Sequence, residues 1–310
     1  MKRRNDASPA AASQPVLEEP EEVPPGRAIE LPGRGTTFVR EVVGPPGAPA
    51  VILLHAFVAT AGTNWLTTMR RLGERFRVLA LDLRGHGRGL RPPKRFRFVD
   101  CADDVAALMS ELGISSAILG GYSMGGPISQ LVWRRHPERV DGLVLASTSY
   151  RLIEGAQARV LLASGMGWVA QATRLAERVP LSGVRGFMPT LAPTSGSLGR
   201  WAADEIRRHH PRSIVEAVVE LGAYNAEKWI GEIDVPTAVV LTTRDNTVDP
   251  LMQLRMARMI PGATVHALAD GHVACTHTLF GSVFAEACNS VADRVAARRA
   301  EAAPGRSRIS

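Results

Sequence analysis

The chain has 310 residues, 45% of them hydrophobic and 22% charged, which is enough to bury a sizeable core and excludes a disordered or fibrous protein. The formal net charge of +7 would suit nucleic-acid binding. However, the chain has few aromatic residues, no recognisable binding module and no long basic helix, so we predict no nucleic-acid partner. No apolar stretch is long enough to span a membrane, and no apolar signal segment follows the basic N-terminus. With only three cysteines, a reducing, cytoplasmic location is expected.

The two ends of the chain differ in composition from the middle. Residues 1–26 are rich in Pro, Ala and Glu without apolar periodicity, which is typical of a disordered leader. Residues 298–310 are predicted to form a basic tail. Between them, Arg27–Leu31 and Thr36–Val43 alternate in polarity and predict an antiparallel pair at a sheet edge.

Short apolar segments then alternate with helical ones, which predicts an α/β fold: a mostly parallel eight-stranded sheet with helices on both faces. The predicted parallel strands are Ala50–Leu54, Arg77–Leu81, Ser116–Gly120, Gly142–Ser147, Thr237–Thr242 and Ala263–Leu268. The predicted core helices are Asn64–Phe76, Phe98–Leu112, Met124–Arg135, Pro250–Met259 and Thr276–Arg298.

The alternation is interrupted at residues 150–234, which contain helical stretches but no strand candidate. These stretches are Ala156–Arg178, Gly199–Arg208 and Ser213–Asn225. Such an insertion would cover the carboxyl end of the sheet, where open α/β folds bind ligands, so we interpret it as a helical lid. A purely structural excursion is the alternative. The core is thereby divided into residues 27–149 and 235–297.

The segment Ala117–Gly126 combines an apolar strand, a serine and the start of a helix. Ser123 lies between Gly121 and Gly125 in the pattern G-x-S-x-G. A serine at so sharp a turn has a strained backbone, and side chains at the flanking positions would collide with the neighbouring strand or helix. The pattern also occurs by chance, so its strand–turn–helix context is what favours a nucleophile over an idle surface serine.

Four motifs in order give the chain a resemblance to α/β-hydrolase fold enzymes of the lidded type, over about Ile29–Ala296. The motifs are His55-Ala56-Phe57, Asp82–Gly87, Gly121–Gly125, and a late aspartate followed by a late histidine. The resemblance implies an esterase- or lipase-like serine hydrolase that needs no cofactor. It also implies the chain order Ser, Asp, His, and a structural rather than catalytic role for the turn at Arg84–Gly87.

A serine hydroxyl needs a neighbouring base to become a nucleophile, and histidine suits this role. His272 directly follows the last predicted strand, where the resembling family has its catalytic histidine, and His277 is its rival. The imidazole in turn needs a carboxylate. Asp245 follows the penultimate strand, at the family's position for the acid, whereas Asp249 precedes Pro250 and suits a helix cap.

A developing oxyanion needs two preorganised N–H donors. The N–H of Met124, directly after Ser123, is one candidate, and the resemblance implies the N–H of Phe57 as the other. The family normally has His-Gly where this chain has His55-Ala56. Because alanine tolerates left-handed backbone poorly, we expect the loop geometry here to differ.

These residues predict a serine hydrolase that cleaves a small-molecule carboxylic ester through an acyl-enzyme, with Ser123, Asp245 and His272 as its triad. A thioesterase, a carbon–carbon bond hydrolase, a cofactor-free haloperoxidase and a non-catalytic ligand receptor on the same fold are the alternatives. The group formed by His272, Cys275 and His277 lacks the paired spacing of zinc sites, so no metal is predicted. The sequence indicates no particular oligomeric state.

Basic residues cluster in the loop after the second parallel strand and in the predicted lid. Positive charge at a cleft would attract an anionic or lipid-like ester, whereas the alternative is ordinary solvated surface charge. The basic residues are Arg84, Arg88, Arg91, Lys94, Arg95 and Arg97 in the loop, and Arg207, Arg208 and Arg212 in the lid.

Overall fold

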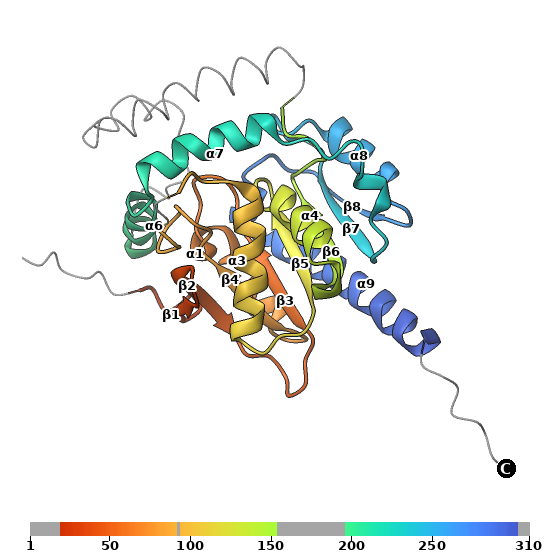
Figure 1. The fold of residues 1–310 in the computed structure, drawn as a ribbon, viewed down its shortest axis with the longest axis horizontal. Helices are drawn as coiled ribbons and strands as arrows, with labels where there is room; N and C mark the ends of the chain where they lie inside the picture. The colour runs from red at the N-terminus through yellow and green to blue at the C-terminus, as the bar shows by residue number, and fades with distance from the viewer. Residues whose placement is uncertain (1–18, 92–93, 154–195, 303–310) are drawn as a thin grey trace, which may run out of the picture.

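The computed structural model describes residues 19–91, 94–153 and 196–302 of the chain (Figure 1). Eight strands form one sheet in the order β1-β2-β4-β3-β5-β6-β7-β8. The pairs β1–β2 and β2–β4 are antiparallel, and all other neighbours are parallel. This confirms the predicted mostly parallel eight-stranded sheet. The strands are β1 Gly26–Leu31, β2 Gly35–Val42, β3 Ala50–Leu54, β4 Arg77–Leu81, β5 Ala117–Tyr122, β6 Val140–Ala146, β7 Thr237–Thr242 and β8 Thr264–Leu268.

Helices cover both faces of the sheet, because successive side chains of a buried strand point to opposite faces. In β3, Ile52 and Leu54 join one core with α3, α4 and α8, whereas Val51 and Leu53 join a second core with α1, α2 and α9. The helices are α1 Ala61–Trp65, α2 Met69–Leu72, α3 Phe98–Glu111, α4 Gly125–Arg135, α6 Ser197–Arg207, α7 Pro211–Ala223, α8 Pro250–Met259 and α9 Thr278–Ala302, with short turns η1 Pro137–Arg139, η4 Ile230–Glu232 and η5 Ala274–Thr276.

The helix predicted over Asn64–Phe76 is two short helices, α1 and α2. Thr67 lies in the break between them. Its hydroxyl donates to the carbonyl of Cys275 at 3.1 Å, and its own carbonyl oxygen packs so closely on Gly281 of α9 that a Cβ there would lie 2.4 Å away. These contacts with the C-terminal part of the chain favour the break over a continuous helix.

Some residues of both predicted end segments belong to the described part of the chain. Residues 19–25, assigned to the disordered leader, pack against β2 and α6: Val23 is buried in a cluster with Trp201 and Ala202 of α6, and the Glu19 carboxylate pairs with the Arg40 guanidinium of β2 at 2.8 Å. At the other end, α9 continues to Ala302, into the predicted basic tail. Residues 1–18 and 303–310 lie outside the described residues.

Two helices of the predicted lid are described, α6 and α7, while Ala156–Arg178 lies outside the described residues. In Figure 1, α7 crosses over the ends of α3 and α4. The Glu220 carboxylate of α7 accepts a hydrogen bond from the N–H of Phe98, the first residue of α3, at 3.1 Å. Within the described ranges, no helix has the length and apolar composition needed to cross a membrane.

The turn between β5 and α4 is packed tightly against its neighbours. Ser123 has a φ of +50°, in the left-handed region. A Cβ on Gly125 would lie 2.1 Å from the carbonyl oxygen of Leu54 in β3, and one on Gly121 would lie 2.4 Å from the carbonyl oxygen of Gly125. The two glycines of the predicted motif are therefore required by close backbone approach.

We predict that Gly125→Ala destabilises the protein by about 2 kcal/mol or more, because its Cβ would overlap a backbone oxygen that the sheet holds in place. Urea unfolding would measure the loss. Gly231→Ala is the matched control, since a Cβ there would have its nearest neighbour, the Met259 carbonyl oxygen, at 3.3 Å. Equal losses in the two variants would contradict the packing argument.

Candidate active site

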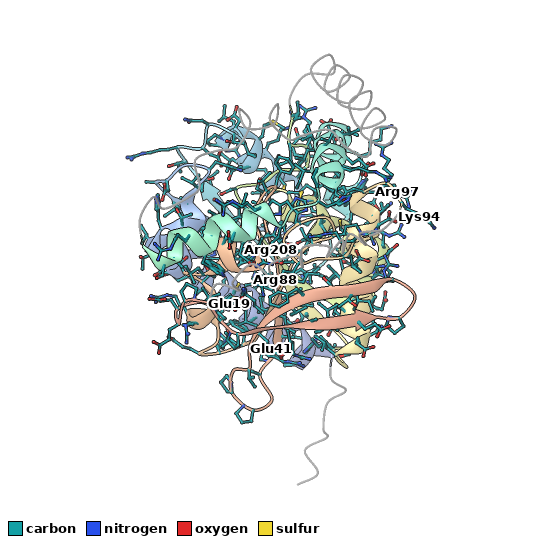
Figure 2. All side chains as sticks on the ribbon, turned by 90° about the vertical axis from the view of Figure 1, so that its left-hand side faces the viewer. Glu19, Glu41, Arg88, Lys94, Arg97 and Arg208 are labelled. Carbon is teal, nitrogen blue, oxygen red and sulfur yellow. The ribbon has the colours of Figure 1, made fainter. Side chains whose placement is uncertain are left out.

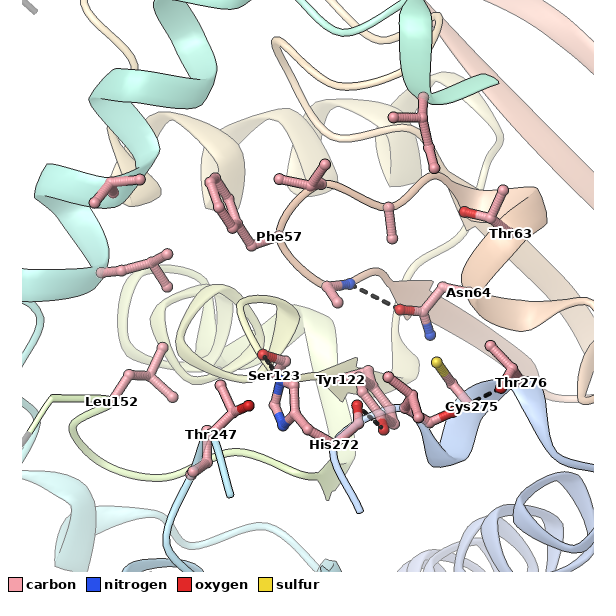
Figure 3. A pocket seen from close by; sticks show the side chains of 18 of the residues that line it. Phe57, Thr63, Asn64, Tyr122, Ser123, Leu152, Thr247, His272, Cys275 and Thr276 are labelled. Carbon is pink, nitrogen blue, oxygen red and sulfur yellow. Dashed lines mark hydrogen bonds between the residues drawn. The ribbon is translucent and has the colours of Figure 1, made fainter. Parts of the chain in front are cut away.

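Loops at the carboxyl ends of β3, β5, β6, β7 and β8 line a pocket of about 510 Å³, and α1, α6 and α7 contribute to its wall (Figure 3). Because these strands are parallel, their carboxyl ends lie at one edge of the sheet. Most of the lining is apolar. The lining residues are Ala56, Phe57, Val58, Ala59, Thr63, Asn64, Tyr122, Ser123, Leu152, Ile153, Ile206, Val218, Leu221, Thr247, Val248, His272, Val273, Cys275 and Thr276.

Ser123 lies in the wall of this pocket with its hydroxyl directed at a histidine. Its Oγ is 2.9 Å from Nε2 of His272. The backbone of the serine is held on both sides: its N–H donates to the carbonyl of Ala146 at 3.0 Å, and its carbonyl accepts from the Thr148 hydroxyl at 2.8 Å. The strained turn is therefore fixed by neighbouring segments, and the hydroxyl has a defined position.

His272 connects the serine to a carboxylate. Its Nδ1 lies 2.8 Å from Oδ2 of Asp245, and its backbone carbonyl accepts from the Tyr122 hydroxyl at 2.9 Å. The structure thus brings Ser123, His272 and Asp245, which three different loops carry, into one hydrogen-bonded chain. This arrangement can move a proton from the serine hydroxyl to the imidazole.

The carboxylate of Asp245 is fully satisfied by hydrogen bonds. Its Oδ1 accepts from the N–H groups of Thr247 and Val248 at 2.8 and 2.9 Å, and its Oδ2 accepts from the Thr242 hydroxyl at 2.9 Å. Burial alone would raise the pKa of Asp245, but the hydrogen bonds and the imidazole of His272 outweigh it and lower that pKa. Asp245 therefore stays ionised beside the histidine.

The two rival residues have other partners. Asp249 precedes α8, where its carboxylate accepts from the N–H of Leu251 at 2.8 Å and caps the helix. His277 contacts the Asp270 carboxylate at 2.5 Å, and it is not among the residues that line the pocket. Neither residue joins the hydrogen-bonded chain at Ser123.

In the described part of the chain, the N–H groups of Phe57 and Met124 donate to no protein acceptor. Met124 directly follows Ser123 and caps α4, so its N–H belongs to the positive end of that helix. Phe57 lines the same pocket as Ser123. Both groups are free to donate to an anionic oxygen.

The loop that carries Phe57 takes its left-handed conformation at Val58, with a φ of +55°, and not at Ala56. His55 helps to hold this loop. Its Nε2 accepts from the N–H of Leu83 at 2.9 Å, so its Nδ1–H donates to the carbonyl of Ala56 at 2.7 Å. Burial lowers the pKa of His55 to about 3, and the imidazole is neutral at physiological pH.

Three supporting residues escaped the sequence analysis: Tyr122 behind His272, Thr242 behind Asp245, and Asn64, whose amide oxygen accepts from the N–H of Ala56 at 2.9 Å. Thr242 carried a weak signal, as a polar residue at the end of an apolar strand. The other two have no sequence signal, because their partners become neighbours only in the folded chain.

The cluster of basic residues is largely neutralised by acidic partners. Arg88, for example, pairs with Glu19 and Glu205, both at 2.8 Å, and Figure 2 shows Arg88 and Arg208 on the same face as Glu19. Arg91 instead donates to main-chain carbonyls. The other carboxylate pairs are Arg84–Asp104, Arg95–Glu220, Arg97–Asp100, Arg207–Asp204, Arg208–Glu205 and Arg212–Glu216.

None of the nine basic residues singled out in the sequence contributes to the described pocket wall. The arrangement therefore favours ordinary ion-paired surface charge over an anion-attracting cleft. Among the described residues, no three His, Cys, Asp or Glu side chains are arranged to hold a metal ion.

Comparisons with known proteins agree with this architecture. The model of the alpha/beta hydrolase fold family matches residues 49–276. A solved hydrolase from Pseudomonas aeruginosa superposes with a TM-score of 0.71 at 23% identity, covering 86% of this chain and 98% of that one.

Two curated relatives differ in the extent of their match. A 3-oxoadipate enol-lactonase from Acinetobacter baylyi is 24% identical over 77% of this chain and 81% of its own. A putative carbamate hydrolase from Caulobacter vibrioides is 32% identical, over 34% of this chain and 39% of its own. The curated relatives at 32–36% identity are matched over only 29–39% of their own length.

The site geometry predicts a selectively reactive serine. A fluorophosphonate probe should label Ser123, because its hydroxyl alone has the His272 imidazole as a base within the described pocket. Ser147 is an internal control: it also has left-handed backbone, with a φ of +48°, but it is fully buried and its hydroxyl is hydrogen-bonded to the Thr242 hydroxyl. Peptide mapping that placed the adduct on Ser147, or on no serine, would overturn this assignment.

Proposed function

Since the chain belongs to the alpha/beta hydrolase fold family, we propose that it is a serine hydrolase that cleaves a carboxylic ester through an acyl-enzyme on Ser123. The observation that carries the proposal is the hydrogen-bonded chain from Ser123 Oγ through the His272 imidazole to the Asp245 carboxylate. It lies in an apolar pocket of a size that suits a small molecule.

In the first half of the reaction, Ser123 Oγ attacks the carbonyl carbon while His272 Nε2 takes the hydroxyl proton. The carbonyl oxygen becomes an oxyanion, for which the N–H groups of Phe57 and Met124 are the donors. As the tetrahedral intermediate collapses, the bond to the alcohol breaks, and His272 returns its proton to the leaving oxygen. The product is an ester of Ser123.

In the second half, a water molecule takes the place of the alcohol. His272 Nε2 removes a proton from the water, whose oxygen attacks the acyl carbon, and the same two N–H groups hold the oxyanion. The bond to Ser123 Oγ then breaks, and His272 returns the proton to that oxygen. The carboxylic acid leaves and the enzyme is restored.

Asp245 holds the imidazole in the productive tautomer. By accepting the Nδ1–H, its carboxylate leaves the lone pair of Nε2 directed at Ser123 and stabilises the imidazolium that forms in each half-reaction. The N–H groups of Thr247 and Val248 fix the orientation of the carboxylate. The low pKa of Asp245 supports this role, since a protonated acid could not accept from Nδ1.

The substrate we propose is a neutral ester with apolar groups on the carbonyl. Phe57, Val218 and Leu221 are among the apolar side chains of the pocket wall, and the basic residues of the surface lie outside it. The enol-lactonase relative supports ester chemistry, since a lactone is a cyclic ester. A non-catalytic receptor on the same fold would bind such a molecule without turnover, and an assay with p-nitrophenyl esters separates the two.

We predict that Asp245→Asn lowers kcat/KM by roughly 10³–10⁴-fold. The N–H groups of Thr247 and Val248 would bind the amide oxygen and turn its NH₂ toward His272 Nδ1. The imidazole would then carry its proton on Nε2 and could not accept one from Ser123. Steady-state hydrolysis of a p-nitrophenyl ester would measure the loss.

Asp249→Asn is the matched control for that variant, since it makes the same chemical change at the cap of α8. Asparagine caps helices as well as aspartate does, so hydrolysis should change by less than about threefold. If Asp249→Asn were the more damaging of the two, the acid would have to be reassigned.

We also predict that salt has the same effect on anionic and neutral substrates. Most of the basic residues in this cluster are paired with carboxylates, and none lines the described pocket, so they should not concentrate anions there. Between 20 and 200 mM NaCl, kcat/KM for a carboxylate-bearing ester and a neutral ester of equal length should change by the same factor. A steep loss for the anionic ester alone would restore the alternative of an anion-attracting cleft.

A further inference from the structure

Asn64 is a buried polar residue in the wall of a mainly apolar pocket. It belongs to α1, which the Thr60 side chain caps, and its side chain is only 1% exposed. In Figure 3 it lies on the same side of the pocket as Thr63, Cys275 and Thr276, away from Leu152 and Thr247. The proposed mechanism makes no use of it.

One hydrogen bond fixes the orientation of the Asn64 amide. Its Oδ1 accepts from the N–H of Ala56 at 2.9 Å, and because a backbone N–H can only donate, the oxygen must be the atom on that side. The NH₂ group is therefore on the other side. Within the described part of the chain, Nδ2 of Asn64 is buried and has no hydrogen-bond acceptor.

The other polar side chains on this side of the pocket already have partners. The Tyr122 hydroxyl donates to the carbonyl of His272, and the Thr276 hydroxyl donates to the carbonyl of Val273. The Thr63 hydroxyl is engaged in the capping box of α1. A buried donor without an acceptor is unfavourable, so the Asn64 NH₂ is the group on this wall that needs a partner from outside the protein.

We propose that Asn64 determines substrate specificity by donating a hydrogen bond to a second oxygen of the ester, separate from the scissile carbonyl. This inference rests on the proposed ester hydrolysis and refines it. A neutral amide donor in an apolar wall suits a ketone, ether or hydroxyl oxygen. A carboxylate is disfavoured, because no lysine or arginine lines the described pocket to balance its charge.

The test compares esters that differ only by this second oxygen. On the acyl side, p-nitrophenyl hexanoate is compared with its 4-oxo and 5-oxo derivatives. On the alcohol side, butyl hexanoate is compared with 2-methoxyethyl hexanoate, which has the same number of heavy atoms. For each pair, the measured quantity is kcat/KM of the oxygenated ester divided by kcat/KM of its plain counterpart. For at least one pair, this ratio should be about five- to tenfold higher in the wild-type protein than in Asn64→Leu.

Using a ratio removes two complications. The intrinsic reactivity of each ester cancels, and so does any general loss that follows when Ala56 loses its acceptor.

Thr276→Val is the matched control: it also changes a polar residue of the pocket wall, but one whose hydroxyl is already satisfied, so its ratio should equal that of the wild type. If Asn64→Leu does not fold, Asn64→Asp at pH 8.5 replaces it, since an ionised carboxylate keeps an acceptor for Ala56 and lacks the donor.

A binding experiment separates this inference from the proposed reaction. In Ser123→Ala, calorimetry should show the same preference for an oxygenated ester, and adding Asn64→Leu should remove it. If the wild type hydrolyses none of the esters but this preference is present, ester hydrolysis is wrong and the role of Asn64 stands. If no oxygenated ester is preferred, or if the preference survives in Asn64→Leu, the role of Asn64 is overturned.

Discussion

The hydrogen bond between Ser123 Oγ and His272 Nε2 joins residues that lie 149 positions apart in the chain, and the sheet makes that contact possible. Strands β5, β6, β7 and β8 are parallel neighbours, so the loops that follow β5, β7 and β8 meet at one edge. The serine, the acid and the histidine each occupy one of these loops. The conformation of each loop then sets the distances between the three side chains.

The sharp turn at Ser123 depends on the same sheet. Its left-handed backbone is unfavourable for serine, and it is held by hydrogen bonds from Thr148 and to Ala146, in the segment that ends β6. On the other side, Gly125 packs directly on the backbone of Leu54 in β3. The strain at the serine is therefore balanced by the two strands next to β5, and the Ser123 hydroxyl lies within hydrogen-bonding distance of His272.

The charged residues of the surface and the lining of the pocket have different roles in this molecule. Arginines around the turn at Arg84–Gly87 and in α6 and α7 hold segments together: Arg88 connects Glu19, before β1, to Glu205 in α6. The pocket behind them is mainly apolar, with few polar groups of fixed orientation. The charges of these arginines are thus largely balanced by carboxylates, and none of the arginines lines the described pocket.

Much of the fold could be predicted because its signals are local. Apolar strand segments such as Ala50–Leu54, and the spacing of Gly121 and Gly125 around Ser123, depend on neighbouring residues and held in the structure. The features that were missed depend on contacts distant in sequence. The break at Thr67 follows from packing on α9, and the ion pair of Glu19 with Arg40 orders a segment whose composition suggested disorder.

The central claim is that the reaction passes through an ester of Ser123, and the most direct test is mass spectrometry of the intact protein, quenched in acid within milliseconds of mixing with p-nitrophenyl hexanoate. The account predicts a mass increase of one hexanoyl group, located on the peptide that contains Ser123 and absent in Ser123→Ala. Hydrolysis that proceeds without any acylated protein, and at an unchanged rate in Ser123→Ala, would contradict it.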